Sequence, residues 1–236
     1  MRQTPSRLLI LLACAVSTQC GGGASDPTNT QPSSVTTGNA GGGGSPAGGS
    51  ETVRAITPMT DNLFDDNDWD QVVETYGATG SGSAGHLSFN GQADAGYRQI
   101  SIHITAGGSG AQLAVFSIHR RVQYSPRNDG DLLYVDYSES SINQASGVQY
   151  SAPAIRQNGK LYTLIPGGQA FTTPDSSWTD HSLAHLTAND FRTIASATDH
   201  PDFTSGVIEF GFMRLQLGQG DTKAGIDNYR LVMYRK

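Results

Sequence analysis

The chain of 236 residues has only two cysteines, Cys14 and Cys20, and both lie within its first twenty residues. The remainder therefore has no disulfide framework and no thiol nucleophile. It also has no run approaching the ~18 apolar residues of a membrane-spanning helix. Basic residues form no long run: without Arg2, Arg7 and Asp26, 13 basic and 20 acidic residues leave a net charge of about −7. This balance argues against nucleic acid and anionic lipid as main partners.

Familiar catalytic signatures are missing as well. The sequence has no G-x-S-x-G elbow, P-loop or dinucleotide fingerprint. Retaining glycosidases need two carboxylates about 5–5.5 Å apart, but the four glutamates after residue 50 are isolated: Glu51, Glu74, Glu139 and Glu209. Glu209 lies in a long apolar stretch, where we expect it to point toward solvent; a carboxylate of raised pKa is the alternative. These absences favour a protein that is not an enzyme.

The N-terminus has the parts of a bacterial export signal. Arg2 and Arg7 supply positive charge, residues 8–13 are apolar, and Cys20 directly precedes three glycines. This order resembles that of bacterial lipoprotein precursors, whose signal ends at a lipid-modified cysteine. The resemblance implies lipidation (palmitate) of Cys20 and anchoring in the cell envelope, on its periplasmic or outer-surface face. Cys14 is the alternative, because a small alanine precedes it, although cleavage there would leave a short apolar region.

Composition divides the chain into three parts. Residues 1–19 are the predicted signal peptide. Residues 20–50 hold the lipidated cysteine and a Gly/Ser/Thr/Pro-rich tract, which cannot bury enough surface to fold and is expected to be a disordered tether. At about 5–6 Å × √n, its typical span is roughly 30 Å. Residues 51–236 contain the aromatic and β-branched residues and are long enough for one domain with its own core.

Apolar and polar residues alternate along this domain with the period of two typical of half-buried strands. Clear examples are residues 100–104, 114–118 and 133–137. Asn158-Gly159 is the preferred pair for a type I′ turn between two strands. Turn residues recur at roughly the 8–12-residue spacing of sandwiches and jelly rolls. The sequence therefore predicts an all-β fold, a jelly-roll β-sandwich.

One short helix is expected within this fold, over residues 188–196. Thr187 is a suitable N-cap and Asp190 stands at N3, which makes a variant of the capping box. Leu186 and Phe191 occupy the N′ and N4 positions of a hydrophobic staple. We expect this helix to cover an open end of the sandwich.

The C-terminal third contains a series of short motifs. WTDHSL at residues 178–183 is followed by IEFGF at 208–212 and GIDNY at 225–229. This order resembles the galactose-binding-like and laminin-B-like jelly-roll domains of secreted and surface proteins. The resemblance implies a carbohydrate-binding or adhesive module more often than an enzyme.

In such domains the closing aspartate often meets an acidic segment around a structural Ca²⁺. The corresponding residues here are Asp65, Asp66, Asp68 and Asp227. Clustered carboxylate oxygens suit this hard cation, which takes 6–8 oxygen ligands. The alternative is that the acidic segment is a solvated turn and that the last aspartate caps another turn.

Aromatic side chains are the best candidates for ligand contact, because their faces stack on sugar rings while polar neighbours bind the hydroxyls. Four residues form the predicted ligand site: Tyr124, Arg127, Tyr137 and Trp69. Tyr124 is the strongest, since polar residues and a proline surround it. Strand alternation allows either Tyr134 or Tyr137 to be exposed, but not both. Trp178 is expected in the core.

Histidines offer two further alternatives. His181 and His185 are four residues apart, a spacing that suits zinc on a helix, although here they flank a turn. For polysaccharide lyase chemistry, which needs a base beside a neutralised carboxylate, the nearby set is His103, His119, Arg120 and Arg121.

The sequence thus favours an exported, membrane-anchored lipoprotein that displays a non-catalytic β-sandwich. The expected partner is a polysaccharide or a surface protein, and nucleic acid is not expected. A jelly-roll polysaccharide hydrolase or lyase is the first alternative. A structural envelope lipoprotein without a ligand is the second.

Overall fold

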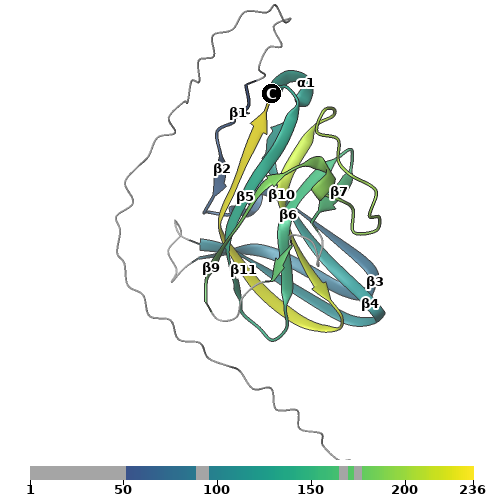
Figure 1. Ribbon diagram of the computed structural model, residues 1–236. Helices are drawn as coiled ribbons and strands as arrows, with labels where there is room; N and C mark the ends of the chain where they lie inside the picture. Colours follow the sequence, from purple (N-terminus) through teal and green to yellow (C-terminus); the bar gives the residue numbers. More distant parts are fainter. Residues whose placement is uncertain (1–51, 89–95, 165–169, 173–176) are drawn as a thin grey trace, which may run out of the picture. The chain divides into compact units, whose positions relative to one another are not determined.

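Strands make up most of the chain that the computed structural model describes, namely residues 52–88, 96–164, 170–172 and 177–236 (Figure 1). The predicted signal peptide, both cysteines and the predicted tether lie outside these residues. The strands are β1 (Arg54–Ala55), β2 (Met59–Asp61), β3 (Trp69–Ser88), β4 (Gly96–Tyr124), β5 (Leu132–Asn143), β6 (Gln149–Gln157), β7 (Lys160–Thr163), β8 (Phe171–Thr172), β9 (Thr179–Leu186), β10 (Ile208–Leu217) and β11 (Gly220–Arg235). The described helical turns are η1 (Asp66–Asp68), α1 (Pro126–Asp129) and η3 (Ala188–Asp190).

These strands join into one curled sheet with the central order β7-β6-β10-β4-β11-β5-β9. β3 pairs with β4, β8 pairs with β6, and the short β1 and β2 pair with β11. The pairings among them are antiparallel. The predicted all-β jelly-roll sandwich is confirmed.

The sandwich has two layers because β3 and β4 bend together from one layer into the other. Residues 112–124 of β4 pair with β10, whereas residues 98–104 pair with β11. The register of β3 on β4 shifts between Tyr76 and Ala78, where the two strands change layer. Layer A consists of residues 69–76 of β3 and 112–124 of β4, with β10, β6 and β7. Layer B consists of residues 78–88 of β3 and 96–104 of β4, with β11, β5 and β9.

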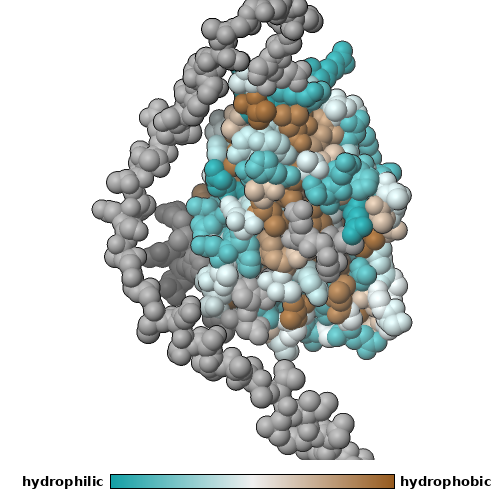
Figure 2. Space-filling model, viewed as in Figure 1, coloured by the Kyte–Doolittle hydropathy of each residue, from teal (hydrophilic) through white to brown (hydrophobic). Residues whose placement is uncertain are grey.

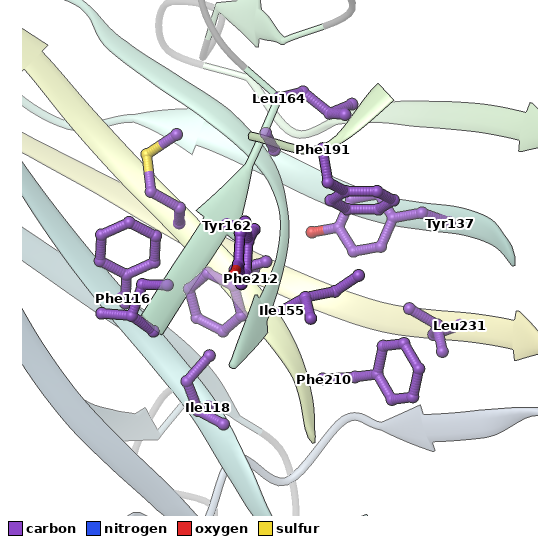
Figure 3. Packing of buried hydrophobic residues seen from close by; sticks show 14 of the residues in the cluster. Phe116, Ile118, Tyr137, Ile155, Tyr162, Leu164, Phe191, Phe210, Phe212 and Leu231 are labelled. Carbon is purple, nitrogen blue, oxygen red and sulfur yellow. The ribbon is translucent and has the colours of Figure 1, made fainter. Parts of the chain in front are cut away.

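Aromatic rings from both layers meet in the core. The Phe212 ring of β10 packs edge-on against Trp69 and Phe64, with ring centroids 5.2 Å and 6.4 Å apart, and Trp69 packs edge-on against Tyr229 at 5.4 Å. Asp61 fixes this arrangement, because its carboxylate accepts the backbone N–H of Phe64 and the indole N–H of Trp69, each at 2.8 Å. Figure 3 shows Phe212 among the buried side chains around it. Burying one such large apolar side chain contributes about 1.5–3 kcal/mol.

A buried ion pair crosses the same interior. Glu139 of β5 and Arg214 of β10 are fully buried, and Nη2 lies 2.9 Å from Oε1. Tyr137 and Ser151 donate their hydroxyl groups to the same carboxylate. Arg214 also donates to the carbonyl oxygen of Gly225 at 3.4 Å. The pair therefore ties layer A to β5 and to the middle of β11.

The strand predictions are confirmed where the alternation was clearest. The inward-facing isoleucines at 100, 102 and 104 are buried, and residues 114–118 and 133–137 lie in β4 and β5. The β6–β7 turn has the predicted form: Asn158 and Gly159 have φ angles of 52° and 77°, and Gln157 pairs with Lys160.

The helix predicted over residues 188–196 is wrong in length. The capping box is present, since the Thr187 backbone donates to the Asp190 carboxylate at 2.8 Å, but only the 3-10 turn Ala188–Asp190 follows. Arg192 then exchanges two backbone hydrogen bonds with Thr163 of β7, at 2.9 Å and 3.0 Å. Pairing with a strand, together with full burial of Phe191, prevails over the local helix signal.

Hydrophilic residues interrupt the apolar patches on the surface that Figure 2 shows. Large apolar side chains that are exposed include Leu63, Trp178 and Leu217. Within the described ranges, no helix has the length and apolar character needed to cross a membrane.

Candidate ligand-binding face

The outer face of layer B carries polar and aromatic side chains, because alternation places its apolar partners inside. Along β4, residues 98, 100, 102 and 104 are buried, whereas Tyr97, Gln99, Ser101 and His103 lie toward solvent. β11 pairs the last three of these outward residues with Gly225, Lys223 and Asp221. β5 continues the face on the other side of β11, since Ile142 also pairs with Gly225.

Gly225 creates the central feature of this face. A Cβ on this residue would lie 2.9 Å from Cη2 of Trp178 and 3.0 Å from Cδ2 of Tyr97, so both rings pass over a strand position that has no side chain. The two rings meet edge to face, with centroids 5.4 Å apart and an interplanar angle of 74°. Trp178 keeps 36% of its surface exposed. We call this pair of rings the aromatic platform.

This position of Trp178 corrects the expectation that it belongs to the core. The residue directly precedes β9, whose Asp180 and Ser182 pair with Ser140 and Ser138 on the outward side of β5. The same alternation places Trp178 on the outer face. Gly225 is the sequence signal that could have located Trp178, because a residue without a side chain leaves room for a bulky ring. The local sequence, however, does not show which residue lies across from a glycine on a neighbouring strand.

Amide groups lie directly beside the platform. Gln144 donates its Nε2 hydrogen to the Tyr97 hydroxyl at 2.9 Å, and Gln99 donates to the Gln144 carbonyl oxygen at 2.7 Å. These side chains are arranged in a short chain of hydrogen bonds along the rim of the rings. These hydrogen bonds hold the two side-chain amides close to any group that rests on the platform.

Two polar depressions adjoin the platform. The β3–β4 depression has a volume of about 440 Å³ and includes Ser81, Ser83, Ser101, His103, Asp221 and Lys223. The β5–β9 depression has a volume of about 380 Å³ and includes Ser138, Ser140, Asp180, Ser182, Asn228 and Arg230. Along β11 they lie on either side of Gly225, since the first includes Asp221 and Lys223 and the second includes Asn228 and Arg230. Residues 221–228 therefore trace a path of roughly 20 Å from one depression across the platform to the other.

Hydrogen bonds hold the polar groups of these depressions in place. Ser140 donates to Asp180 at 2.5 Å and accepts from the Asn228 amide at 3.0 Å. His103 contacts the Asp221 carboxylate through Nδ1. Burial raises the pKa of Asp227 despite the hydrogen bond from the Asn228 backbone. The face thus presents hydroxyl, amide and carboxylate groups around one aromatic centre.

Three of the four predicted ligand residues are buried, which corrects that prediction. Trp69 and Tyr124 are each 2% exposed and Tyr137 is 1% exposed, so none offers a ring face to a ligand. Tyr124 instead donates its hydroxyl to the Gly130 carbonyl at 2.6 Å, which closes the loop around α1. Only Arg127, on α1, is exposed. The hydroxyl and indole groups of the three buried rings have hydrogen-bond partners inside the protein, and the local composition of the sequence does not reveal these partners.

The strand alternation of β5 was predicted correctly. Tyr137 points inward, and Tyr134 lies on the partly exposed side. There the Tyr134 ring stacks between Tyr234 and His185, with both centroid distances at 4.5 Å.

The acidic residues predicted to bind calcium have other partners. Asp66 forms an ion pair with Arg98 at 2.6 Å, and Asp68 pairs with Arg121 at 2.6 Å. Asp65 accepts the backbone N–H of Asn67 at 2.9 Å, and Asp227 lies on β11. Across the described residues, no group of three or more His, Cys, Asp or Glu is arranged to hold a metal. Calcium binding stays a prediction that this geometry does not support.

The histidine alternatives do not assemble into sites. His181 stacks on Phe171 at 4.2 Å, whereas His185 stacks on Tyr134, so the proposed zinc ligands have different surroundings. In the lyase set, His119 is buried against Trp69 and burial lowers its pKa. His103 instead lies on the outer face of layer B.

The two arginines of the lyase set and Glu209 are engaged in ion pairs. Arg120 pairs with Asp70 at 2.5 Å, and Arg121 pairs with Asp68. Glu209 is partly buried and pairs with Arg156 at 2.6 Å. This arginine holds the pKa of Glu209 below its ordinary value, which contradicts the alternative of a raised pKa.

No family model matches the sequence, and no curated protein matches it. Several solved structures are similar. The family 11 carbohydrate-binding module of a cellulosomal cellulase of Clostridium thermocellum is 15% identical, with 75% of this chain and 94% of that chain covered and a TM-score of 0.45. The family 30 module of another cellulosomal cellulase of the same organism is 9% identical, with 73% and 96% covered and a TM-score of 0.43. A module described for specific mannan recognition is 13% identical, with 78% and 99% covered and a TM-score of 0.39.

Proposed function

We propose that this protein is a non-catalytic glycan-binding module that a lipid at Cys20 anchors to the cell envelope. The observation that carries the proposal is the aromatic platform of Trp178 and Tyr97 over Gly225. Apolar faces of sugar rings stack on such exposed rings, and the flanking amides and hydroxyls match the donors and acceptors of sugar hydroxyls. Water that leaves the ring surfaces supplies the driving force, and the polar rim supplies the orientation.

The extent of the face favours a chain of several sugar units. Both depressions adjoin the platform along β11, over about 20 Å. A ligand that follows this line meets Lys223 on one side of the rings and Asp180 on the other. This arrangement supports a polysaccharide rather than a single sugar.

Affinity gels with immobilised mixed-linkage β-glucan, mannan and β-1,4-galactan test the platform. We expect one of these polymers to retard the wild-type protein, and Trp178→Ala to reduce this retardation strongly, because the variant loses the larger ring of the aromatic platform. Trp178→Phe keeps a ring and should retain part of it. Leu63→Ala is the matched control, since Leu63 is an exposed apolar residue outside the platform. Runs with Ca²⁺ and with chelator test the calcium prediction in the same gels.

If none of the three polymers retards the wild-type protein, or if Trp178→Ala binds as the wild-type protein does, the platform has no role in glycan binding. The structural envelope lipoprotein without a ligand would then be the better hypothesis for the first outcome.

The anchor is tested separately in the full chain. Metabolic labelling with palmitate in a bacterial host should label the wild-type protein and the Cys14→Ala variant, but not Cys20→Ala. Labelling that depends on Cys14 would move the lipid to the alternative site. Absence of label from the wild-type protein would overturn the anchor and leave the glycan proposal intact.

A further inference from the structure

A third cavity lies on the outer face of layer A. Its volume is about 520 Å³, and the residues around it include Glu74, Tyr76, Lys160, Leu161, Thr193 and Asp199. Three segments far apart in the sequence meet here: the end of β3 in layer A, the tip of the β6–β7 hairpin, and the chain after η3.

The register of β3 places this cavity on the opposite side from the aromatic platform. Glu74 pairs with Ala114 and Tyr76 with Gln112, on the side of β4 that faces away from Phe212 and Arg214. The platform lies on the outer face of layer B. The packed core separates the two, so one ligand chain cannot occupy both without passing around an edge of the sandwich.

The polar groups of the cavity are paired with each other. Tyr76 donates its hydroxyl to Glu74, and Lys160 Nζ lies 2.8 Å from the Asp199 carboxylate. The first pair lies within β3, whereas the second joins the β6–β7 hairpin to the chain after η3. Both pairs hold their side chains in place before a ligand arrives. Preorganised groups lose less entropy on binding, so such pairing favours a built site over an incidental gap.

The chemistry of the wall repeats that of the platform. The Tyr76 ring is partly exposed, Leu161 adds apolar surface, and the hydroxyl of Thr193 and the carboxylates of Glu74 and Asp199 offer hydrogen-bonding groups. The charges compensate in part, which suits a neutral ligand rich in hydroxyl groups. An aromatic ring beside several polar groups is the combination that binds a sugar ring.

We propose that this cavity is a second glycan site, which makes the module bivalent. The inference rests on the proposed function, because it assigns the same class of ligand to a second face. Two sites on opposite layers hold two polysaccharide chains at once, and a bivalent protein gains avidity of about 10²–10⁴ for a polymer surface. The protein then connects polysaccharide chains as well as binding them.

Calorimetry measures the number of binding sites. The ligand is a tetrasaccharide fragment of the polymer that retards the wild-type protein in the gels. We expect two sites in the wild-type protein, one in Trp178→Ala, one in Lys160→Ala and none in the double variant. Tyr76→Phe keeps the ring and removes only the hydroxyl, so it should weaken the second site without emptying it. Leu63→Ala again serves as the control and should keep two sites.

A second measurement follows cross-linking directly. Beads coated with the same polymer should aggregate with the wild-type protein and stay dispersed with either single variant. One site in the wild-type protein, with Lys160→Ala binding unchanged, overturns the second site and leaves the platform standing. No binding by the wild-type protein to any of the three polymers overturns the proposed function itself.

Discussion

Gly225 shows how the absence of one side chain builds the candidate site. A methyl group there would collide with Trp178, Tyr97 and Ile142, each within 3.0 Å. The nearest atom is the far end of the Trp178 ring, so the ring moves more easily than the backbone. We expect Gly225→Ala to lower glycan affinity about tenfold, or about 1.4 kcal/mol. Calorimetry measures this loss.

Gly108→Ala is the control for this change, because a Cβ on Gly108 would meet no atom within 4 Å. Both variants should remain folded, which thermal melting checks. Unchanged affinity in Gly225→Ala would mean that the position of Trp178 does not determine binding.

The fully buried pair of Glu139 and Arg214 gives a second prediction for a single residue. Glu139→Gln keeps the shape of the side chain but leaves the Arg214 charge uncompensated in the core. We expect the free energy of unfolding to fall by about 3–5 kcal/mol. Asp199→Asn removes a carboxylate from an exposed pair with Lys160 and should cost less than about 1 kcal/mol.

Urea denaturation of both variants compares these costs. Similar small losses would show that the buried carboxylate is not charged or that its neighbours adjust. Since Arg214 also donates to the Gly225 carbonyl, Glu139→Gln should weaken glycan binding as well as stability.

At the scale of elements, β3 is a long strand that, among the strands the structure describes, pairs with β4 alone. Such an edge invites pairing with another chain, and Gln71 occupies part of it. Its amide donates to the Gly82 carbonyl at 3.2 Å and accepts the Ala84 N–H at 2.7 Å, because β3 bends back across its own first half. We expect Gln71→Ala to free these groups and to promote self-association, seen by size-exclusion chromatography.

Thr75→Ala is the control for the edge, since Thr75 is exposed on the same strand. A monomeric Gln71→Ala at every concentration would show that the edge needs no protection. Loss of stability without association would assign Gln71 to folding alone.

Elements were easier to predict than the site, and particular residues show why. Alternation at 100–104 and the Asn158-Gly159 turn are local patterns, and the structure follows them. The capping box at Thr187 is local too, but pairing of Arg192 with Thr163 replaced the helix. A local signal fails where a distant strand offers backbone partners.

Site residues depend on which side of a layer each strand presents. The polar neighbours of Tyr124 predict an exposed ring, and Trp69 is a further predicted ligand residue. Both are buried, because the fold supplies partners for their hydroxyl and indole groups. Trp178 is expected in the core, yet it lies on the outer face, because it directly precedes β9 on that side. The polarity of the sequence neighbours does not determine either outcome.

At the scale of the whole molecule, two histidines with lowered pKa values make stability depend on pH. Burial is the main cause that lowers the pKa of His119 and of His181 below the ordinary value of 6.5. The unfolded chain therefore binds more protons than the folded protein just below that value. Their contribution to stability is present above pH 6.5 and is lost as the pH falls toward the folded-state pKa values.

Carboxylates extend the same trend to lower pH. Hydrogen bonds from Arg120 lower the pKa of Asp70, and those from Arg156 lower that of Glu209, below ordinary values of 3.8 and 4.5. Their stabilisation is lost as the pH falls through the folded-state values. Asp227 acts in the opposite direction, because burial raises its pKa.

We therefore expect the free energy of unfolding to decrease in two steps, the first below about pH 6.5 and the second below about pH 4. Urea denaturation between about pH 7.5 and about pH 3 measures both steps. The double variant His119→Gln, His181→Gln should flatten the first step and keep the second. Parallel curves for the wild-type protein and the double variant would contradict the assignment to these histidines.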